Sequence, residues 1–312
     1  MIKVIKSGIQ LTIQDLGRVG FRHLGVSRSG SLDSYAHIIA NRLLNNTDNA
    51  AVLELTVGLC ELQFQCDTVI ALHGADLKAT LDGHPLYPGW SYPVKAMQTL
   101  KFVTGRSGSR AYIAVKGGIE CPEVMGSKST DLGAAIGGFN GRALQSGDMI
   151  AISPYSKAWL GNKGALTPPK RSIIRLHEGP HHELLTPACI NTFCETSFTI
   201  NPNSNRMGVR LDHKNTAIMQ HTLSLPSVAV APGSIQLPPD GNTIVLLNDG
   251  QTTGGYPLIA HVIEADLHQF AQFRTADPIT FEFVSLEQAN AAKNKLDAHL
   301  AQLKLSLSRY WN

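Results

Sequence analysis

The sequence lacks any block of like charge and any long apolar run. Its 27 Lys and Arg residues and 24 Asp and Glu residues are scattered along 312 positions and leave a formal net charge of +3. A nucleic-acid-binding domain usually shows a basic patch, and a membrane-spanning helix needs roughly 18 or more consecutive apolar residues. We therefore expect neither nucleic acid nor a membrane as a partner.

Paired cysteines and targeting signals are missing as well. The five cysteines include no Cys-x-x-Cys pair, and their odd number argues against a disulfide framework. The opening, MIKVIKSG, has neither the long apolar core nor the small-residue cleavage site of a signal peptide. These features predict a cytoplasmic protein with reduced, mostly structural thiols.

Several chemical motifs are also absent from the sequence. It contains no Gly-x-x-x-x-Gly-Lys-Ser/Thr phosphate loop, no His-Glu-x-x-His zinc motif and no Ser/His/Asp order that indicates a nucleophile. The stretch HEGPHHE does carry histidines, but His181 and His182 are adjacent and point apart on an extended chain. We predict no metal site, and we expect that the chain does not bind ATP by itself in a standard way.

What the sequence does contain is mostly strand-like. Leu62, Phe64 and Cys66 alternate with polar residues, and glycine or proline recurs at intervals of about ten residues through this half. This pattern favours a β-barrel or sandwich over alternating strands and helices. The alternation of Ile279, Phe281 and Phe283 indicates a further strand near the C-terminal end.

Two helices interrupt the strand pattern. Apolar residues between Leu32 and Leu43 recur at helical spacing, with Ser31 or Asp33 placed to cap the start. Ser285 and Gln288 have the spacing of a capping box at the start of a C-terminal helix. The apolar seam of that helix comprises Ala289, Ala292, Leu296, Leu300, Leu303 and Leu307.

The length of the chain predicts two domains, because one hydrophobic core usually stops growing at about 250–300 residues. The stretch from Ser153 to Arg171 is rich in glycine, proline and lysine, which is linker composition. We predict an N-terminal β-rich domain over residues 1–155, a linker over 156–171, a C-terminal β-barrel domain over 172–284 and a C-terminal helix over 285–312.

The most unusual stretch runs from Leu247 to Pro257 and reads LNDGQTTGGYP. It lies between two apolar runs that read as buried strands, 243–247 and 258–263. Its glycines allow positive φ and close backbone approach, so the amides of 252–255 could form a nest for an anion. Alternatively, the stretch is a connection whose polar groups satisfy only its own backbone.

Other polar residues allow a functional and a structural interpretation. Arg18 and the start of the first helix could bind a carboxylate or phosphate, or Asp15 and Arg18 could form a turn pair while Asp33 caps the helix. Arg206 could hold a substrate carboxylate with both arms of its guanidinium, or pair with Asp212 at the surface.

Five stretches together resemble one known family. They read TIQDLGRVG, SGSLDSYAHIIAN, MGSKSTDLGAAIGGFNGR, SNRMGVRL and LNDGQTTGGYPLIAHVIEAD. In this order, and over nearly the full length, they resemble the allophanate hydrolase subunit 2 family, also called the biotin-dependent carboxyltransferase family. The resemblance implies a mainly β fold with two cyclophilin-like, barrel-type subdomains and a few helices, including the C-terminal one.

The family resemblance also implies an activity and partners. Free-standing members of this size resemble a component of bacterial ATP-dependent 5-oxoprolinase, which converts 5-oxoproline (pyroglutamate) to L-glutamate. The B subunit of 5-oxoprolinase is the closest implied partner, and its A subunit completes the enzyme; ATP is used by the assembled complex, and no cofactor is expected firmly on this chain. Two alternatives stay open: a carboxyltransferase like that of urea amidolyase, which uses biotin, and a non-catalytic antagonist of a kinase inhibitor.

From these residues we predict a site for a small-molecule substrate. Asp249 is the candidate proton acceptor, the loop from Gln251 to Gly255 would stabilise a developing oxyanion, and Arg206 would hold a carboxylate. The predicted catalytic residues are Asp249, Gln251, Thr252 and Thr253. The predicted substrate-binding residues are Asn205, Arg206, Asn248, Gly254, Gly255, Tyr256, Arg18 and Asp15.

Overall fold

The structure is a computed structural model that describes residues 1–105, 107–155, 159, 161–166, 171–213, 223, 225–275 and 277–310. The chain forms two compact units. Unit 1 comprises residues 1–19, 29–169 and 299–312, and unit 2 comprises residues 20–28 and 170–298. We call residues 20–28 the strap, because they belong to unit 2 although they lie within the N-terminal half. Of the predicted linker, residues 156–158, 160 and 167–170 lie outside the described residues.

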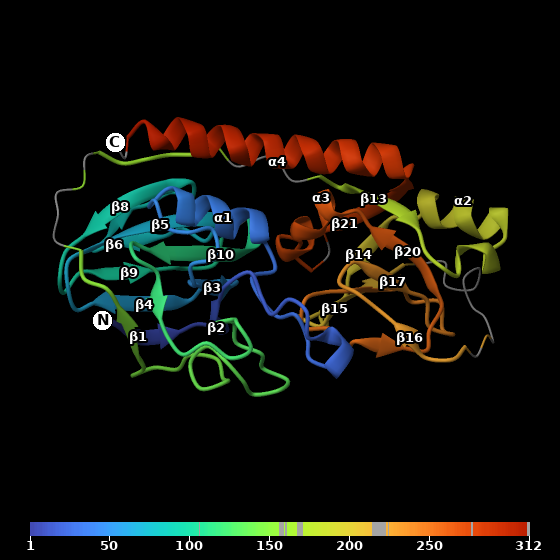
Figure 1. Ribbon diagram of the computed structural model, residues 1–312, viewed down its shortest axis with the longest axis horizontal. Helices are drawn as coiled ribbons and strands as arrows, with labels where there is room; N and C mark the ends of the chain where they lie inside the picture. The colour runs from blue at the N-terminus through green and yellow to red at the C-terminus, as the bar shows by residue number, and fades with distance from the viewer. Residues whose placement is uncertain are drawn as a thin grey trace. The chain divides into compact units, whose positions relative to one another are not determined.

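Unit 1 consists mainly of two antiparallel sheets (Figure 1). The first has the strand order β11 (Ile119–Glu120), β12 (Met149–Ile152), β1 (Ile2–Ser7), β4 (Cys60–Phe64), β9 (Thr99–Lys101), β6 (Thr80–Leu81) and β7 (His84–Pro85). The second has the order β2 (Gln10–Gln14), β3 (Val52–Thr56), β10 (Ser107–Val115), β5 (Thr68–Asp76) and β8 (Trp90–Val94).

Helix α1 (Ser34–Arg42) packs against strands β5 and β10 of the second sheet. The predicted cap is confirmed at Asp33, whose side chain accepts a hydrogen bond of 2.8 Å from the backbone N–H of Ala36. Ser31, the other candidate, instead lies 2.8 Å from Nδ1 of His37. The cap therefore satisfies one of the N–H groups that a helix start leaves without an intrahelical partner.

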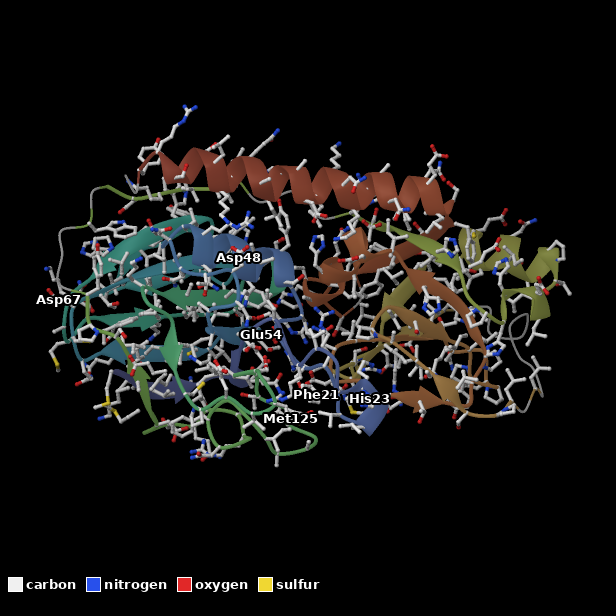
Figure 2. The ribbon with its side chains drawn as sticks, viewed as in Figure 1. Phe21, His23, Asp48, Glu54, Asp67 and Met125 are labelled. Atoms are coloured by element: carbon white, nitrogen blue, oxygen red, sulfur yellow. The ribbon has the colours of Figure 1, made fainter. Side chains whose placement is uncertain are left out.

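A buried carboxylate fixes the approach to this helix. Glu54 is 1% exposed and accepts hydrogen bonds from the Tyr112 hydroxyl at 2.8 Å and the Leu32 amide at 2.9 Å (Glu54 is labelled in Figure 2). The Tyr112 oxygen in turn accepts from the amide of Asp33 at 2.8 Å. Since a buried charge is tolerated only when it is well bonded, this network makes the chain entry into α1 specific.

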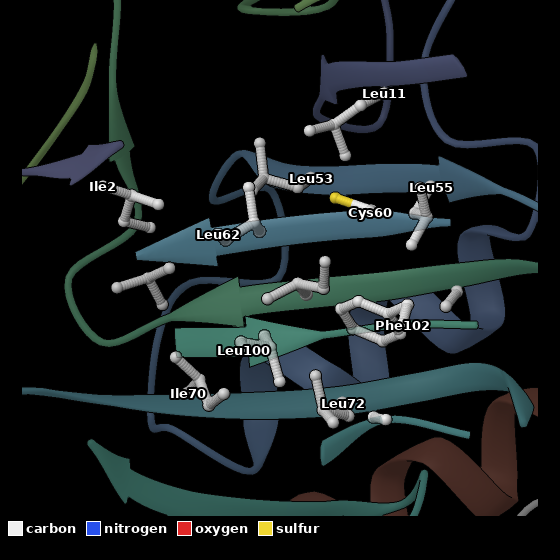
Figure 3. Packing of buried hydrophobic residues seen from close by; sticks show 14 of the residues in the cluster. Ile2, Leu11, Leu53, Leu55, Cys60, Leu62, Ile70, Leu72, Leu100 and Phe102 are labelled. Atoms are coloured by element: carbon white, nitrogen blue, oxygen red, sulfur yellow. The ribbon is translucent and has the colours of Figure 1, made fainter. Parts of the chain in front are cut away.

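The two sheets of unit 1 share one hydrophobic core (Figure 3). Leu62 is fully buried and faces the same cluster as Leu53 and Ile70, which come from the second sheet. The predicted alternation around Leu62 is confirmed, because its neighbours Glu61 and Gln63 are partly exposed. Period-two burial of this kind holds each strand in register, since a slip by one residue would turn the apolar side chains outward.

Unit 2 is built on a closed barrel. Its strand order is β13 (Ile173–Glu178), β20 (Leu258–Val262), β17 (Ser234–Gln236), β18 (Ile244–Leu246), β15 (Gly208–Asp212), β14 (Phe198–Ile200) and β21 (Pro278–Phe283). A small separate sheet pairs β16 (Val228–Ala229) with β19 (Thr253–Gly254). The short helices of unit 2 are η1 (Arg22–Leu24), η2 (His182–Leu184), α2 (Pro187–Glu195), α3 (Glu264–Leu267) and η4 (His268–Ala271).

The long C-terminal helix α4 (Leu286–Ser308) begins with the predicted capping box. The Ser285 amide donates to Oε1 of Gln288 at 2.9 Å, and the Gln288 amide donates to Oγ of Ser285 at 3.2 Å. The division between the two units falls within this helix, after residue 298. The prediction of a mainly β protein with a C-terminal helix is confirmed (Figure 1). Among the described residues, no helix combines the length and apolarity that a membrane crossing requires.

Replacing Leu62 by alanine should lower the free energy of unfolding by about 2–5 kcal/mol, because the residue is 0% exposed and its loss leaves a cavity. Leu305→Ala is the matched control, since Leu305 is 67% exposed, and its effect should stay within about 0.5 kcal/mol. Urea denaturation followed by circular dichroism measures both values. Equal effects of the two substitutions would contradict the assignment of the core.

Candidate functional site

The stretch from Leu247 to Pro257, called the loop below, connects strands β18 and β20 of the barrel in unit 2. Its middle part is strand β19, in which Thr253 lies opposite Ala229 and Gly254 lies opposite Val228. The Val230 amide adds a hydrogen bond of 3.0 Å to the carbonyl of Thr252. The loop is therefore fixed by backbone pairing with the segment 228–230.

The glycines of the loop serve close packing and not unusual backbone angles. None of Gly250, Gly254 and Gly255 has a positive φ, so the prediction of a backbone nest at residues 252–255 is wrong. A Cβ at position 254 would lie 2.4 Å from Nε2 of Gln236, and one at position 250 would lie 2.8 Å from the carbonyl oxygen of Met207. Both positions exclude a side chain because neighbouring polar atoms come so near.

Arg206 and Asp249 form a buried ion pair that holds the start of the loop. Nε of Arg206 lies 2.8 Å from one carboxylate oxygen of Asp249, and Nη2 lies 2.9 Å from the other. The two side chains are only 4% and 8% exposed. Such two-pronged contact between charged groups is the stronger kind of hydrogen bonding. The predicted roles of Arg206 as carboxylate clamp and Asp249 as proton acceptor stay predictions, and each requires this pair to open or to share its atoms.

The alternative prediction for Arg206, a surface pair with Asp212, is wrong. Arg206 is buried against Asp249, and the Asp212 carboxylate accepts two hydrogen bonds of 2.9 Å from Nδ2 of Asn201. The partner of Arg206 lies 43 positions along the chain, so no local spacing points to it.

The loop presents a set of polar side chains on one part of unit 2. Gln251, Thr253 and Tyr256 are exposed, whereas Asn248, Thr252, Gly254 and Gly255 are partly buried. Nε2 of Gln251 donates to Oε1 of Gln236 at 3.1 Å, and Oδ1 of Asn205 accepts from the Met207 amide at 2.8 Å. The structure thus gathers the predicted residues at 205–206 and 248–256 in unit 2, and their contact with a substrate stays a prediction.

Asp15 and Arg18, the other predicted substrate-binding residues, lie in unit 1 and are 2% and 1% exposed. The Asp15 carboxylate accepts hydrogen bonds from the Ser127 and Ser129 hydroxyls and from the Lys128 amide. Burial raises the pKa of Asp15, but the hydrogen bonds from Ser129, Ser127 and two backbone amides outweigh it and lower the pKa. The geometry gives Asp15 a structural role in fastening the segment 127–129, and its contact with substrate stays a prediction.

The sequence analysis missed Arg22, which lies in helix η1 of the strap. Nη2 of Arg22 donates to the carbonyl oxygens of Val230 and Gln251, each at 2.8 Å. Figure 2 labels its chain neighbours, Phe21 and His23, beside the strands of unit 2. Arg22 therefore anchors the strap to the loop, over a sequence separation of 229 residues. No local pattern signals this contact.

The histidines of unit 2 take part in its hydrogen bonding. Nδ1 of His181 accepts from the Leu258 amide at 2.9 Å, and Nδ1 of His261 lies 3.1 Å from the Ser234 hydroxyl. Burial lowers the pKa of His261, and the nearby His177 lowers it further. In the part of the chain that the structure describes, no group of three or more His, Cys, Asp or Glu residues is arranged to hold a metal ion.

Comparison with known proteins defines the class. The family model described as "Carboxyltransferase domain, subdomain A and B" matches residues 24–283, and the chain belongs to this family. It is 41% identical to the C subunit of 5-oxoprolinase from Escherichia coli and 37% identical to that from Haemophilus influenzae, covering 97% of this chain and 97% and 98% of those proteins. The structure of Kluyveromyces lactis urea amidolyase superimposes with a TM-score of 0.86 at 28% identity, covering 97% of this chain and 20% of that one.

Truncating Asp249 to alanine should lower the free energy of unfolding by about 3–5 kcal/mol, because it leaves the buried Arg206 guanidinium without its carboxylate. Asp240→Ala removes an exposed carboxylate from the same unit and should change stability by less than about 1 kcal/mol. Denaturant unfolding of the full chain tests the pair. A loss at position 249 no larger than that at position 240 would show that the ion pair does not hold the loop.

Proposed function

We propose that this chain is one component of a cytoplasmic, ATP-dependent 5-oxoprolinase, which opens the lactam of 5-oxoproline to give L-glutamate. The supporting observation is the 41% identity to the C subunit of 5-oxoprolinase from Escherichia coli, which extends over 97% of both chains. By contrast, the urea amidolyase of Saccharomyces cerevisiae is matched at 30% identity over only 18% of its length. A free-standing component is therefore better supported than a carboxyltransferase domain of a larger biotin-dependent enzyme.

The proposal includes partner proteins. The relatives from both bacteria carry the letter C among the 5-oxoprolinase subunits, which implies at least two further kinds. We assign the B subunit of 5-oxoprolinase as the direct partner and the A subunit as the one that completes the enzyme. The chain alone would be inactive. Because its sequence has no recognisable phosphate loop, we assign the main contacts with ATP to the assembled complex.

The chemistry explains why ATP is needed. A lactam carbonyl is a poor electrophile, and transfer of the γ-phosphoryl group to its oxygen turns that oxygen into part of a leaving group. Water then adds to the ring carbon, the C–N bond breaks, and hydrolysis of the phosphate bond leaves L-glutamate, ADP and phosphate. In this proposal Gln251 and Thr253, both exposed on the loop, donate hydrogen bonds to the oxygen on which negative charge develops.

The role of the chain is tested by mixing it with the candidate partner proteins, 5-oxoproline and ATP, and measuring glutamate. We expect glutamate release from the full mixture and none when this chain is omitted. Size-exclusion chromatography verifies that the complex has formed. An assembled complex without activity would contradict the proposal and would favour carboxyl transfer or a regulatory role.

The role of the loop is tested with Gln251→Ala combined with Thr253→Ala. Loss of these donors should reduce turnover at least about 100-fold, a typical effect of removing one oxyanion donor, without unfolding the chain. Gln302→Ala, an exposed glutamine on α4, serves as the control and should retain full activity. If both single variants and the double variant retain activity, the loop is not the catalytic site.

A further inference from the structure

Three buried N–H groups near the loop lack a hydrogen-bond partner among the described residues. They are Nη1 of Arg22, Nε of Arg28 and Nε2 of Gln236, and Gln236 as a whole is only 1% exposed. An unpaired buried donor costs about 1–3 kcal/mol, and more when it is charged. Native proteins keep such groups rarely, and a bound ion, ligand or water is a common reason.

Two of these groups flank the same residue, Gln251. Nη2 of Arg22 bonds the Gln251 carbonyl, and Nη1 is attached to the same guanidinium carbon. On the side-chain end, Oε1 of Gln236 accepts from Gln251, and the unpaired Nε2 belongs to the same amide group. The absent side chain at Gly254 leaves room beside this nitrogen, because a Cβ there would lie 2.4 Å from it.

The charges at this place are of one sign. Burial lowers the pKa of Arg22, and the positive charge of Arg28 lowers it further, which places the two guanidinium groups within electrostatic reach of each other. Neither forms a salt bridge with a carboxylate among the described residues. Arg206, by contrast, has its carboxylate in Asp249. Two neighbouring, partly buried cations without a counter-ion are stabilised by an anion.

We propose that the strap and the loop form a binding site for an oxyanion, in which Arg22 and Arg28 supply charged donors and Gln236 supplies a neutral one. The guanidinium group matches the two oxygens of a carboxylate and those of a phosphoryl group equally well. If the chain acts in a 5-oxoprolinase, the carboxylate of 5-oxoproline and a phosphate of ATP are the two available sources. The site itself does not depend on that function.

Isothermal titration calorimetry on the full chain tests this site with three probes: inorganic phosphate, 5-oxoproline and 5-oxoprolinamide, which lacks the carboxylate. Arg28→Gln is the main variant, because its side chain has no hydrogen bond within the described residues that folding would lose. Arg22→Gln is the second variant. Arg210→Gln, an exposed arginine on β15, is the matched control.

We expect at least one of the two anions to bind, with a Kd raised at least about tenfold by either Arg28→Gln or Arg22→Gln and unchanged by Arg210→Gln. Binding should weaken with added sodium chloride. Binding of 5-oxoproline but not its amide identifies a carboxylate site, and binding of phosphate alone identifies a phosphoryl site. Absence of binding to the unmodified chain, or equal Kd values for the Arg28 variant and the control, would overturn the proposal. Loss of glutamate release with intact anion binding would overturn only the assigned reaction.

Discussion

The buried ion pair between Arg206 and Asp249 is the constraint on which the candidate site depends. It joins the approach to β15 with the end of β18, and backbone hydrogen bonds from Asp249 to Arg206 and from Leu247 to Met207 reinforce the same junction. An uncompensated charge here would be expensive, so the two residues hold each other in one arrangement. The loop that follows is then free to present Gln251 and Thr253 outward.

The ion pair also separates two kinds of arginine in unit 2. Arg206 is committed to the architecture, because both arms of its guanidinium contact one carboxylate. Arg22 is only partly committed: one nitrogen anchors the strap to Val230 and Gln251, and another is buried without a partner in the described part of the chain. A charged group in the second situation is better suited to receive a ligand.

Features that depend on neighbouring residues could be predicted from the sequence. The capping box at Ser285 and Gln288 and the cap at Asp33 involve partners three positions away, and the alternation around Leu62 follows from the geometry of a strand. The site depends on distant pairs. The partner of Arg206 and the strap contact of Arg22 follow from the closed fold, and a glycine such as Gly254 looks the same in sequence whether it serves positive φ or close packing.

The most direct measurement is an experimental structure of the assembled complex with 5-oxoproline bound. We predict that the ligand lies on unit 2, beside the loop, with its carboxylate within hydrogen-bond distance of Arg22 or Arg28. A ligand bound at Asp15 and Arg18 in unit 1, or entirely on a partner protein, would contradict the assignment of the loop and the strap as the substrate site.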